Sequence, residues 1–129
     1  MLETVLLIDD DETDHFFFNR LVKNTELIKQ AICFQYADEA LEYLKQTDRP
    51  KINAIFLDIN MPRMNGFEFL EEAERLLPES FGEKAVVVML TSSIAPQDKE
   101  RANGFSAIKA YVNKPLDAKG LADIIANIS

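Results

Sequence analysis

The amino-acid sequence predicts an α/β fold, in which one parallel sheet of five strands is covered by helices on both faces. Three short, nearly continuous apolar runs, at residues 5–8, 54–57 and 86–90, have the pattern of strands buried on both faces. The segments between them carry apolar residues at helical spacing. Strands that alternate with helices in this way form parallel sheets with right-handed crossover connections.

Two further segments complete the predicted sheet, although their apolar runs are weaker. Residues 32–36 follow the first helical segment, and residues 110–112 precede the last one. Each strand is then followed by one helix, which makes five βα units. Because no internal repeat, linker or low-complexity tract interrupts the series, residues 1–129 are expected to form a single domain.

Four helices are predicted from stripes of apolar residues three and four positions apart. The stripes are Phe17, Phe18, Leu21 and Val22; Ala37, Ala40, Leu41 and Leu44; Phe67, Leu70 and Ala73; and Leu121, Ile124, Ile125 and Ile128. Residues 93–103 form the weakest predicted helix, in which Pro96 suits a first turn and Gly104 a C-terminal stop. Ala102 is almost the only apolar residue inside it, so we expect this helix to be marginally stable and mobile.

Composition and charge exclude several classes of protein. The chain is 47% hydrophobic and 28% charged, as ordinary globular domains are and disordered chains are not. Its 14 Lys and Arg against 22 Asp and Glu give a net charge of -8, which repels nucleic-acid phosphates and anionic lipids. There is no basic leader and no stretch of about 18 apolar residues, so we expect a cytoplasmic protein that binds neither nucleic acid nor membrane.

Three conspicuous features have ordinary interpretations. Cys33 is the only cysteine, which excludes an internal disulfide and favours a small buried hydrophobe. His15, the only histidine, starts the first helix and is expected to be solvated. Residues 16–18 are three phenylalanines in a row, which a helix cannot bury on one face, so one of them is a candidate contact for a partner.

Acidic residues fall directly after two of the predicted strands. Asp9, Asp10 and Asp11 follow the first strand, and Asp58 follows the third. In doubly wound sheets of order 2-1-3-4-5, ligands bind outside the carboxyl ends of strands 1 and 3, which are neighbours about 4.7–4.9 Å apart. Asp9, Asp10 and Asp58 can therefore converge, and a divalent cation would relieve their repulsion. Mg2+, which takes few carboxylates and keeps several waters, suits so open a site.

A lysine and a threonine are predicted at the same edge of the sheet. Lys114 follows the fifth strand, and Thr91 follows the fourth. Taken alone, Asp58 or Thr91 would be interpreted as a cap or turn residue, and Lys114 as a solvated side chain. Together they offer a carboxylate nucleophile, an ammonium and a hydroxyl beside a cation, which is a site for phosphoryl transfer. Asp58, Lys114 and Thr91 are therefore the candidate catalytic residues.

Four motifs occur in order along the chain. They are Leu-Ile-Asp-Asp-Asp at 7–11, Leu-Asp-Ile-Asn-Met-Pro-Arg-Met-Asn-Gly at 57–66, Leu-Thr-Ser at 90–92 and Tyr-Val-Asn-Lys-Pro at 111–115. Over its whole length the chain resembles the receiver domains of two-component response regulators, including the stand-alone chemotaxis receivers. The resemblance implies a flavodoxin-like doubly wound (βα)5 three-layer sandwich, with a parallel five-stranded sheet of order 2-1-3-4-5.

The resemblance also implies a site. Asp58 would be the phosphoacceptor, and Mg2+, the only cofactor, would be held by Asp9, Asp10, Asp58 and the backbone carbonyl of Asn60. Lys114 would contact the phosphoryl oxygens. Asp11 is common at its position but is not usually a ligand, so it is left outside the metal site.

Four more positions match the motifs. Thr91 and Tyr111 would be the switch pair whose coupled movement reports phosphorylation, although Tyr111 also suits a partly buried aromatic with its hydroxyl in water. The Lys114–Pro115 bond would be cis, and Gly66 would relieve the loop before the third helix. The chain departs from the family in Asn65, where an aspartate is frequent, and in a somewhat long connection at 78–84.

The implied protein is a stand-alone receiver, since no output domain follows Ser129. It would accept a phosphoryl group from a sensor histidine kinase or a histidine phosphotransfer protein. It would be a phosphoacceptor signalling protein rather than an enzyme, catalysing only its own phosphorylation and slow dephosphorylation. Docking to a downstream protein target and relaying the phosphoryl group both remain open, as does a monomer or weak dimer.

Two alternatives belong to other classes. A phosphatase of the haloacid dehalogenase type also uses an aspartate nucleophile with Mg2+ and a lysine, but it needs a general acid two residues later, where this chain has Asn60. A flavodoxin-like electron carrier would need a hydroxyl-rich phosphate loop after the first strand, where this chain has three aspartates.

Overall fold

The computed structural model describes residues 2–79, 81 and 85–128. In this part of the chain five parallel strands form one sheet of order β2-β1-β3-β4-β5, which confirms the predicted order. Strands and helices alternate throughout. The elements are β1 Leu2–Ile8, α1 Glu12–Thr25, β2 Ile28–Phe34, α2 Ala37–Leu44, β3 Ala54–Leu57, α3 Gly66–Leu76, β4 Val87–Thr91, α4 Pro96–Ala102, β5 Ile108–Asn113 and α5 Ala118–Ile128.

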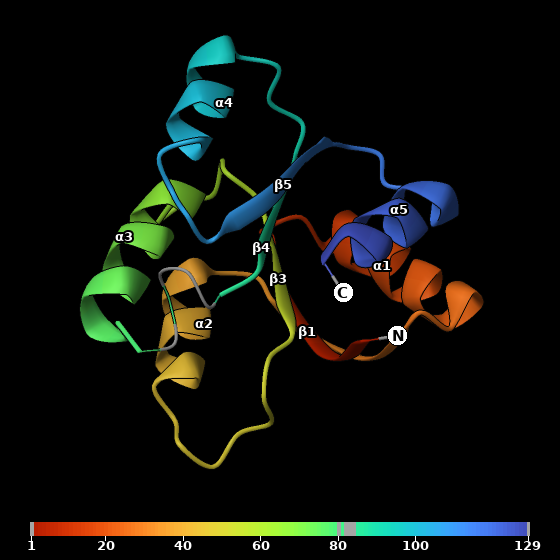
Figure 1. The fold of residues 1–129 in the computed structure, drawn as a ribbon, viewed down its shortest axis with the longest axis horizontal. Coiled ribbons are helices and arrows are strands. Elements are labelled where there is room, and N and C mark those ends of the chain that lie inside the picture. Colours follow the sequence, from red (N-terminus) through yellow and green to blue (C-terminus); the bar gives the residue numbers. More distant parts are fainter. Residues whose placement is uncertain (1, 80, 82–84, 129) are drawn as a thin grey trace.

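The sheet lies between two layers of helices (Figure 1). Helices α1 and α5 cover one face, where Phe18 and Leu121 pack with Phe56 of the sheet. Helices α2, α3 and α4 lie on the other side, around a second cluster that includes Leu57 and Phe67. Strands β1, β3 and β4 carry apolar side chains into both clusters, which explains why their sequences are nearly continuous apolar runs.

The second strand differs from its prediction. It was expected at 32–36, but β2 spans Ile28–Phe34 and includes the exposed Lys29 and Gln30. A strand at the edge of a sheet is solvated along one side, so it needs no continuous apolar run. Gln35 and Tyr36 lie beyond the strand, and Tyr36 occupies the N-cap position of α2.

The fourth helix is shorter than predicted. It begins at Pro96 rather than at residue 93, because residues 93–95 form a turn in which the Ser93 hydroxyl accepts a hydrogen bond from the backbone N–H of Ala95. Thr91 was expected to follow β4 but is its last residue. The predicted long connection at 78–84 lies partly outside the described residues.

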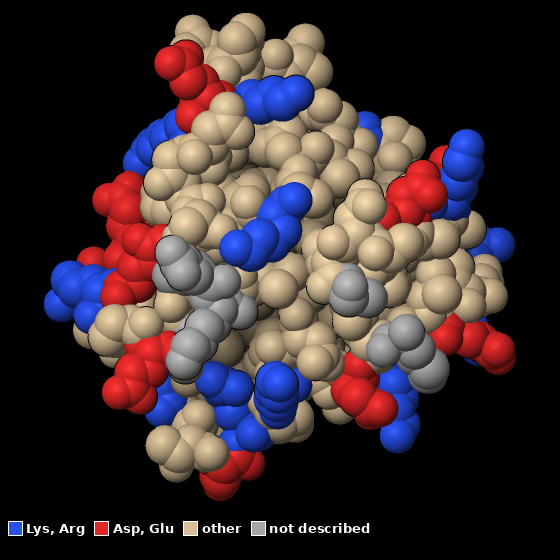
Figure 2. Space-filling view, viewed as in Figure 1, with Lys and Arg blue, Asp and Glu red and all other residues tan. Residues whose placement is uncertain are grey.

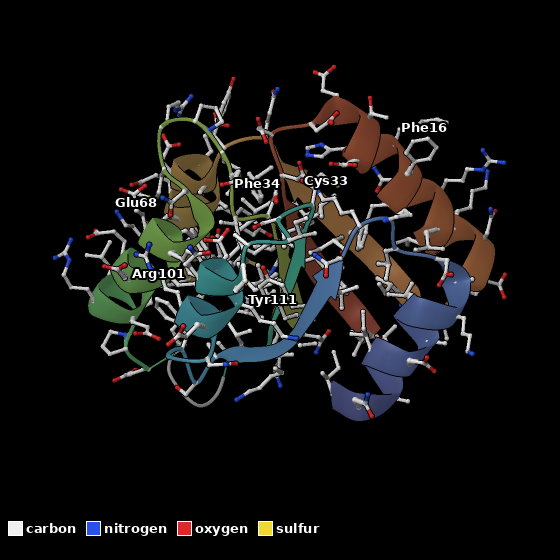
Figure 3. The ribbon with its side chains drawn as sticks, turned by 90° about the horizontal axis from the view of Figure 1, so that it is seen from above. Phe16, Cys33, Phe34, Glu68, Arg101 and Tyr111 are labelled. Carbon is white, nitrogen blue, oxygen red and sulfur yellow. The ribbon has the colours of Figure 1, made fainter. Side chains whose placement is uncertain are left out.

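The first helix buries fewer aromatics than its stripe predicted. Phe18 is buried, but Phe16 and Phe17 are 61% and 56% exposed, so the prediction that Phe17 belongs to the buried face is wrong. Figure 3 shows Phe16 projecting outward from α1. Cys33 is half-buried against the cluster beneath α1. Among the described residues, no helix combines the length and apolar character needed to cross a membrane.

Candidate functional site

Sheet hydrogen bonds bring the predicted residues together at the carboxyl ends of the strands. The backbone N–H of Asp9 donates to Phe34 at 3.0 Å, and that of Asp58 donates to Ile8 at 3.0 Å. At the ends of the neighbouring strands β4 and β5, the N–H of Lys114 donates to the carbonyl of Thr91 at 2.9 Å. The backbone N–H of each of these residues thus continues the hydrogen-bonding pattern of the sheet by one residue. The sheet therefore fixes the backbone position of each residue.

Three carboxylates converge at this edge. Asp9, Asp10 and Asp58 each offer an oxygen, and these oxygens lie within 4.8 Å of one another. Asp9 and Asp58 are only 1% and 6% exposed. Clustered, poorly solvated carboxylates repel one another, and a hard divalent cation with oxygen ligands removes that repulsion. The three side chains therefore fit an Mg2+ ion.

The surroundings raise the pKa values of the two buried carboxylates, Asp9 and Asp58. Burial raises the pKa of Asp9 from 3.8 to about 6, against the lowering effects of Lys114 and of the Asp11 N–H, which donates at 2.9 Å. Burial also raises the pKa of Asp58, against the lowering effects of the Lys114 charge and of the Ile59 N–H, which donates at 2.8 Å. Without a cation, both carboxylates are more easily protonated than ordinary aspartates.

Lys114 reaches into the same cluster. Its Nζ lies 2.7 Å from Asp9 Oδ2, 2.6 Å from Asp14 Oδ2 and 3.5 Å from Asp58 Oδ2. Burial lowers the pKa of Lys114, but hydrogen bonds to Asp14 and Asp9 outweigh that effect and raise it, so the side chain is an ammonium. The Lys114–Pro115 peptide bond is cis, as predicted.

Thr91 and Tyr111 lie toward α4. Thr91 is fully buried, and its hydroxyl accepts a hydrogen bond from the Ser93 N–H at 3.1 Å. Tyr111 is half-buried in β5, packs against the cluster beneath α3 and α4, and lies beside α4 in Figure 3. Burial, followed by the charge of Asp98, raises the pKa of Tyr111. The interpretation of Tyr111 as an aromatic with its hydroxyl in water is wrong, because the hydroxyl oxygen is buried.

The loop after β3 depends on Gly66. A Cβ atom at Gly66 would overlap the carbonyl oxygen of Asp58 and lie 3.2 Å from the Cα of Ile59, so no other residue fits without moving the loop. The Gly66 N–H donates to the Ile59 carbonyl at 2.9 Å. Asn65, where the chain departs from the family that it resembles, caps α3 through a reciprocal capping box with Glu68.

Two residues near the site were not predicted. Asp14 contacts Lys114, and its position three residues after the helix cap Asp11 was the only signal for it. His15 was expected to be solvated but is half-buried, with Nε2 2.5 Å from the Asp9 carbonyl. Asp11 itself caps α1 by accepting a hydrogen bond from the Thr13 N–H at 2.8 Å.

Comparison with known proteins identifies the family. The sequence model of the response regulator receiver domain matches residues 5–126. The chain belongs to this family. Receiver domains bind Mg2+ at an aspartate cluster and act with histidine kinases or phosphotransfer proteins in two-component signalling. The aspartate cluster described above is of this kind. Neither the dehalogenase-type phosphatase nor the electron carrier finds support in this match.

The proteins that this chain is similar to include two named as response regulators and one named as a sensory/regulatory protein. A two-component response regulator from Cytophaga hutchinsonii is 28% identical, with a TM-score of 0.87 over 98% of this chain and 96% of that one. Response regulator Rcp1 of Synechocystis is 25% identical over 98% of this chain and 86% of its own. The sensory/regulatory protein RpfC of Xanthomonas campestris is 26% identical over 97% of this chain, which spans only 16% of that protein.

Proposed function

We propose that this receiver accepts a phosphoryl group on Asp58 in a reaction that requires Mg2+. One observation carries the proposal: the oxygens of Asp9, Asp10 and Asp58 lie within 4.8 Å of one another, with the Lys114 ammonium 3.5 Å from Asp58. Asp9, Asp10, Asp58 and the backbone carbonyl of Asn60 would hold the cation. Asn60 is exposed in the loop two residues after Asp58.

In the proposed step, a carboxylate oxygen of Asp58 attacks the phosphorus of a phosphohistidine on a sensor histidine kinase or phosphotransfer protein. The new O–P bond forms as the P–N bond breaks, and the electron pair of that bond returns to the imidazole nitrogen. Bound Mg2+ supplies charge neutralisation for the phosphoryl oxygens. Lys114 supplies an N–H donor to one of those oxygens, and Thr91 supplies a hydroxyl.

The switch would run through Thr91 and Tyr111. A phosphoryl oxygen that accepts a hydrogen bond from the Thr91 hydroxyl would draw that hydroxyl toward Asp58, and with it the Ser93 N–H, which donates to the same hydroxyl at 3.1 Å. Residue 93 begins the turn into α4, and Tyr111 lies beside that helix (Figure 3). Helix α4 is short and buries only Ala102, so a small free-energy change can move it. The readout would be docking to a downstream target or onward relay of the phosphoryl group.

Partners would approach beside α1. An open groove of about 490 Å3 adjoins the site and is lined by Asp9, Asp14 and Lys114 and by apolar side chains that include Phe17 and Leu116. Figure 2 shows Asp and Glu side chains along one side of the face it displays and several Lys and Arg side chains gathered at its lower edge. The net charge of -8 nevertheless favours protein partners over nucleic acid or membrane.

The test uses acetyl phosphate as donor and intact mass as readout. Wild-type protein with Mg2+ should gain one phosphoryl group, and a chelator should prevent it. Asp58→Asn should gain none, whereas Asp48→Asn, at an exposed acid in the connection between α2 and β3, should behave as wild type. Equal incorporation by Asp58→Asn would refute the acceptor. Incorporation that survives chelation would refute the role of the metal.

A further inference from the structure

Lys114 lies among three carboxylates, one of which, Asp14, has no part in the proposed phosphoryl-transfer reaction. Its ammonium has three N–H groups. Two of them donate hydrogen bonds, to Asp9 at 2.7 Å and to Asp14 at 2.6 Å. Asp58 lies farther away, with 3.5 Å between Lys114 Nζ and Asp58 Oδ2. Asp14 belongs to α1 and not to the cluster of three converging carboxylates.

The two hydrogen-bonded partners are not equivalent. Asp9 is one of the proposed cation ligands, so a bound Mg2+ competes with Lys114 for the charge of the Asp9 carboxylate. Asp14 has no such competitor, and its side chain is 31% exposed against 1% for Asp9. Its hydrogen bond to Lys114 is charge-assisted and therefore among the stronger ones in proteins.

We infer that Asp14 is a positioning residue: it anchors the Lys114 ammonium beside Asp58 when a divalent cation occupies Asp9, leaving one N–H free for a phosphoryl oxygen. The inference rests on the proposed function of Asp58 and Lys114 and adds a residue to it. The backbone of Lys114 is fixed by its hydrogen bond to Thr91, but a flexible side chain of four carbons separates that backbone from Nζ. Without Asp14, the cation would leave the ammonium with no fixed partner.

The anchor can be tested without any phosphoryl donor. Nitrogen-15 spectra report a lysine ammonium when hydrogen bonds slow its proton exchange, and Lys114→Arg assigns the signal. In wild type the Lys114 signal should persist when Mg2+ alone is added. In Asp14→Ala it should be lost on Mg2+ addition, through fast exchange. Glu12→Ala is the matched control, because it removes one exposed carboxylate from the same helical turn.

A kinetic measurement tests the consequence for the reaction. At saturating acetyl phosphate, Asp14→Ala should be phosphorylated about tenfold more slowly than wild type, the effect expected for one charge-assisted hydrogen bond. Asp14→Glu, which keeps the carboxylate, should recover most of that rate, and Glu12→Ala should match wild type. Circular-dichroism melting should show that all variants are folded.

The outcomes separate this inference from the proposed function. A Lys114 signal that survives Mg2+ equally well in Asp14→Ala, or that is absent from wild type with Mg2+, would overturn the anchor. So would equal phosphorylation rates in Asp14→Ala and wild type. A wild-type protein that takes up no phosphoryl group would instead refute the proposed function, and the spectra would still decide whether Asp14 holds Lys114.

Discussion

Asp9 is the carboxylate whose properties depend most on the fold. It follows a strand whose last five residues are buried, and burial raises the pKa of Asp9 from 3.8 to about 6. Between these two values the folded protein holds a proton that the unfolded chain has released. The stabilising contribution of that proton is therefore complete below about pH 3.8 and is lost as the pH rises through about 6.

A proton and a Mg2+ ion compete for the Asp9 carboxylate, so the affinity for Mg2+ should depend on pH. Below pH 6 the apparent affinity for Mg2+ should fall by up to about tenfold per pH unit, because one proton must leave Asp9 before the ion binds. Calorimetric titrations between pH 5 and 8 would measure it. Asp9→Asn should bind Mg2+ weakly with a much flatter pH dependence. An affinity in wild type that stays constant from pH 5 to 7 would contradict the raised pKa.

Sequence reasoning found the residues that directly follow strands and missed those that depend on tertiary packing. Asp9, Asp58 and Lys114 are adjacent to strand ends, so their convergence follows from sheet order alone. Asp14 and His15 reach the site from α1, whose apolar stripe packs on the core as predicted except at Phe17, which is exposed. Side-chain contacts of this kind depend on how α1 packs on the sheet, and the spacing of apolar residues in the sequence does not specify that packing in detail.

At the scale of elements, the loop between β3 and α3 makes a sharp prediction. Gly66→Ala places a Cβ against the carbonyl of Asp58 and forces the loop to move, which should cost about 1–3 kcal/mol of unfolding free energy. It should also weaken Mg2+ binding, because Asp58 shifts with its carbonyl. Urea unfolding with and without Mg2+ would measure both effects.

Gly120→Ala is the matched control for Gly66→Ala. A Cβ there would meet the movable carboxylate of Asp117 at 3.0 Å, within a helix that alanine favours. Its effect should be smaller than that of Gly66→Ala, and Mg2+ binding should be unchanged. Equal effects of the two substitutions would show that the close approach to Asp58 does not constrain the loop.

Helix α4 is the element from which we expect the signal to leave the site. It is attached through Ala102 in the core and through Arg101, whose guanidinium pairs with Glu71 at 2.8 Å and lies 4.5 Å from the Phe67 ring centroid (Figure 3). The two Arg101 contacts join α4 to α3, and α4 also packs against β5. The helix can therefore shift when the turn at residue 93 is drawn toward a phosphoryl group.

Amide chemical shifts with beryllofluoride, a phosphoryl mimic, test this movement. Wild-type shifts should change across residues 93–112 as well as around Asp9 and Asp58. Thr91→Ala should still bind the mimic, but its changes should remain near the site. If the changes in wild type also remained confined to the site, a plain phosphoryl shuttle would be the better account.

At the scale of the whole molecule, the strands β1, β3 and β4 were predictable because buried parallel strands are marked by continuous apolar runs, whereas the order of the sheet came from the resemblance. The edge strand β2 and the turn before α4 were misplaced for the opposite reason: their residues are half-solvated, so polar positions interrupt the pattern. The loop geometry that Gly66 permits was expected only through resemblance, since it depends on backbone contacts between distant residues.

The metal site should couple to the stability of the entire fold. Mg2+ binds the native state, in which Asp9, Asp10 and Asp58 converge, and scarcely binds the unfolded chain, in which they do not. The melting temperature should rise with Mg2+ concentration by mass action, and at 100 times the Kd the gain is about 2.7 kcal/mol. Asp10→Ala should remove most of this response, while Asp48→Asn should keep it. An unchanged response in Asp10→Ala would rule out the proposed ligand set.

The central claim, that Asp58 receives the phosphoryl group, is tested most directly by locating the acyl phosphate. Borohydride reduces the aspartyl phosphate to homoserine with release of phosphate, and peptide mass spectrometry then reads the position. After treatment with acetyl phosphate and Mg2+, the account predicts homoserine at position 58 and at no other aspartate. Homoserine at position 9, 10 or 14, with Asp58 intact, would contradict it.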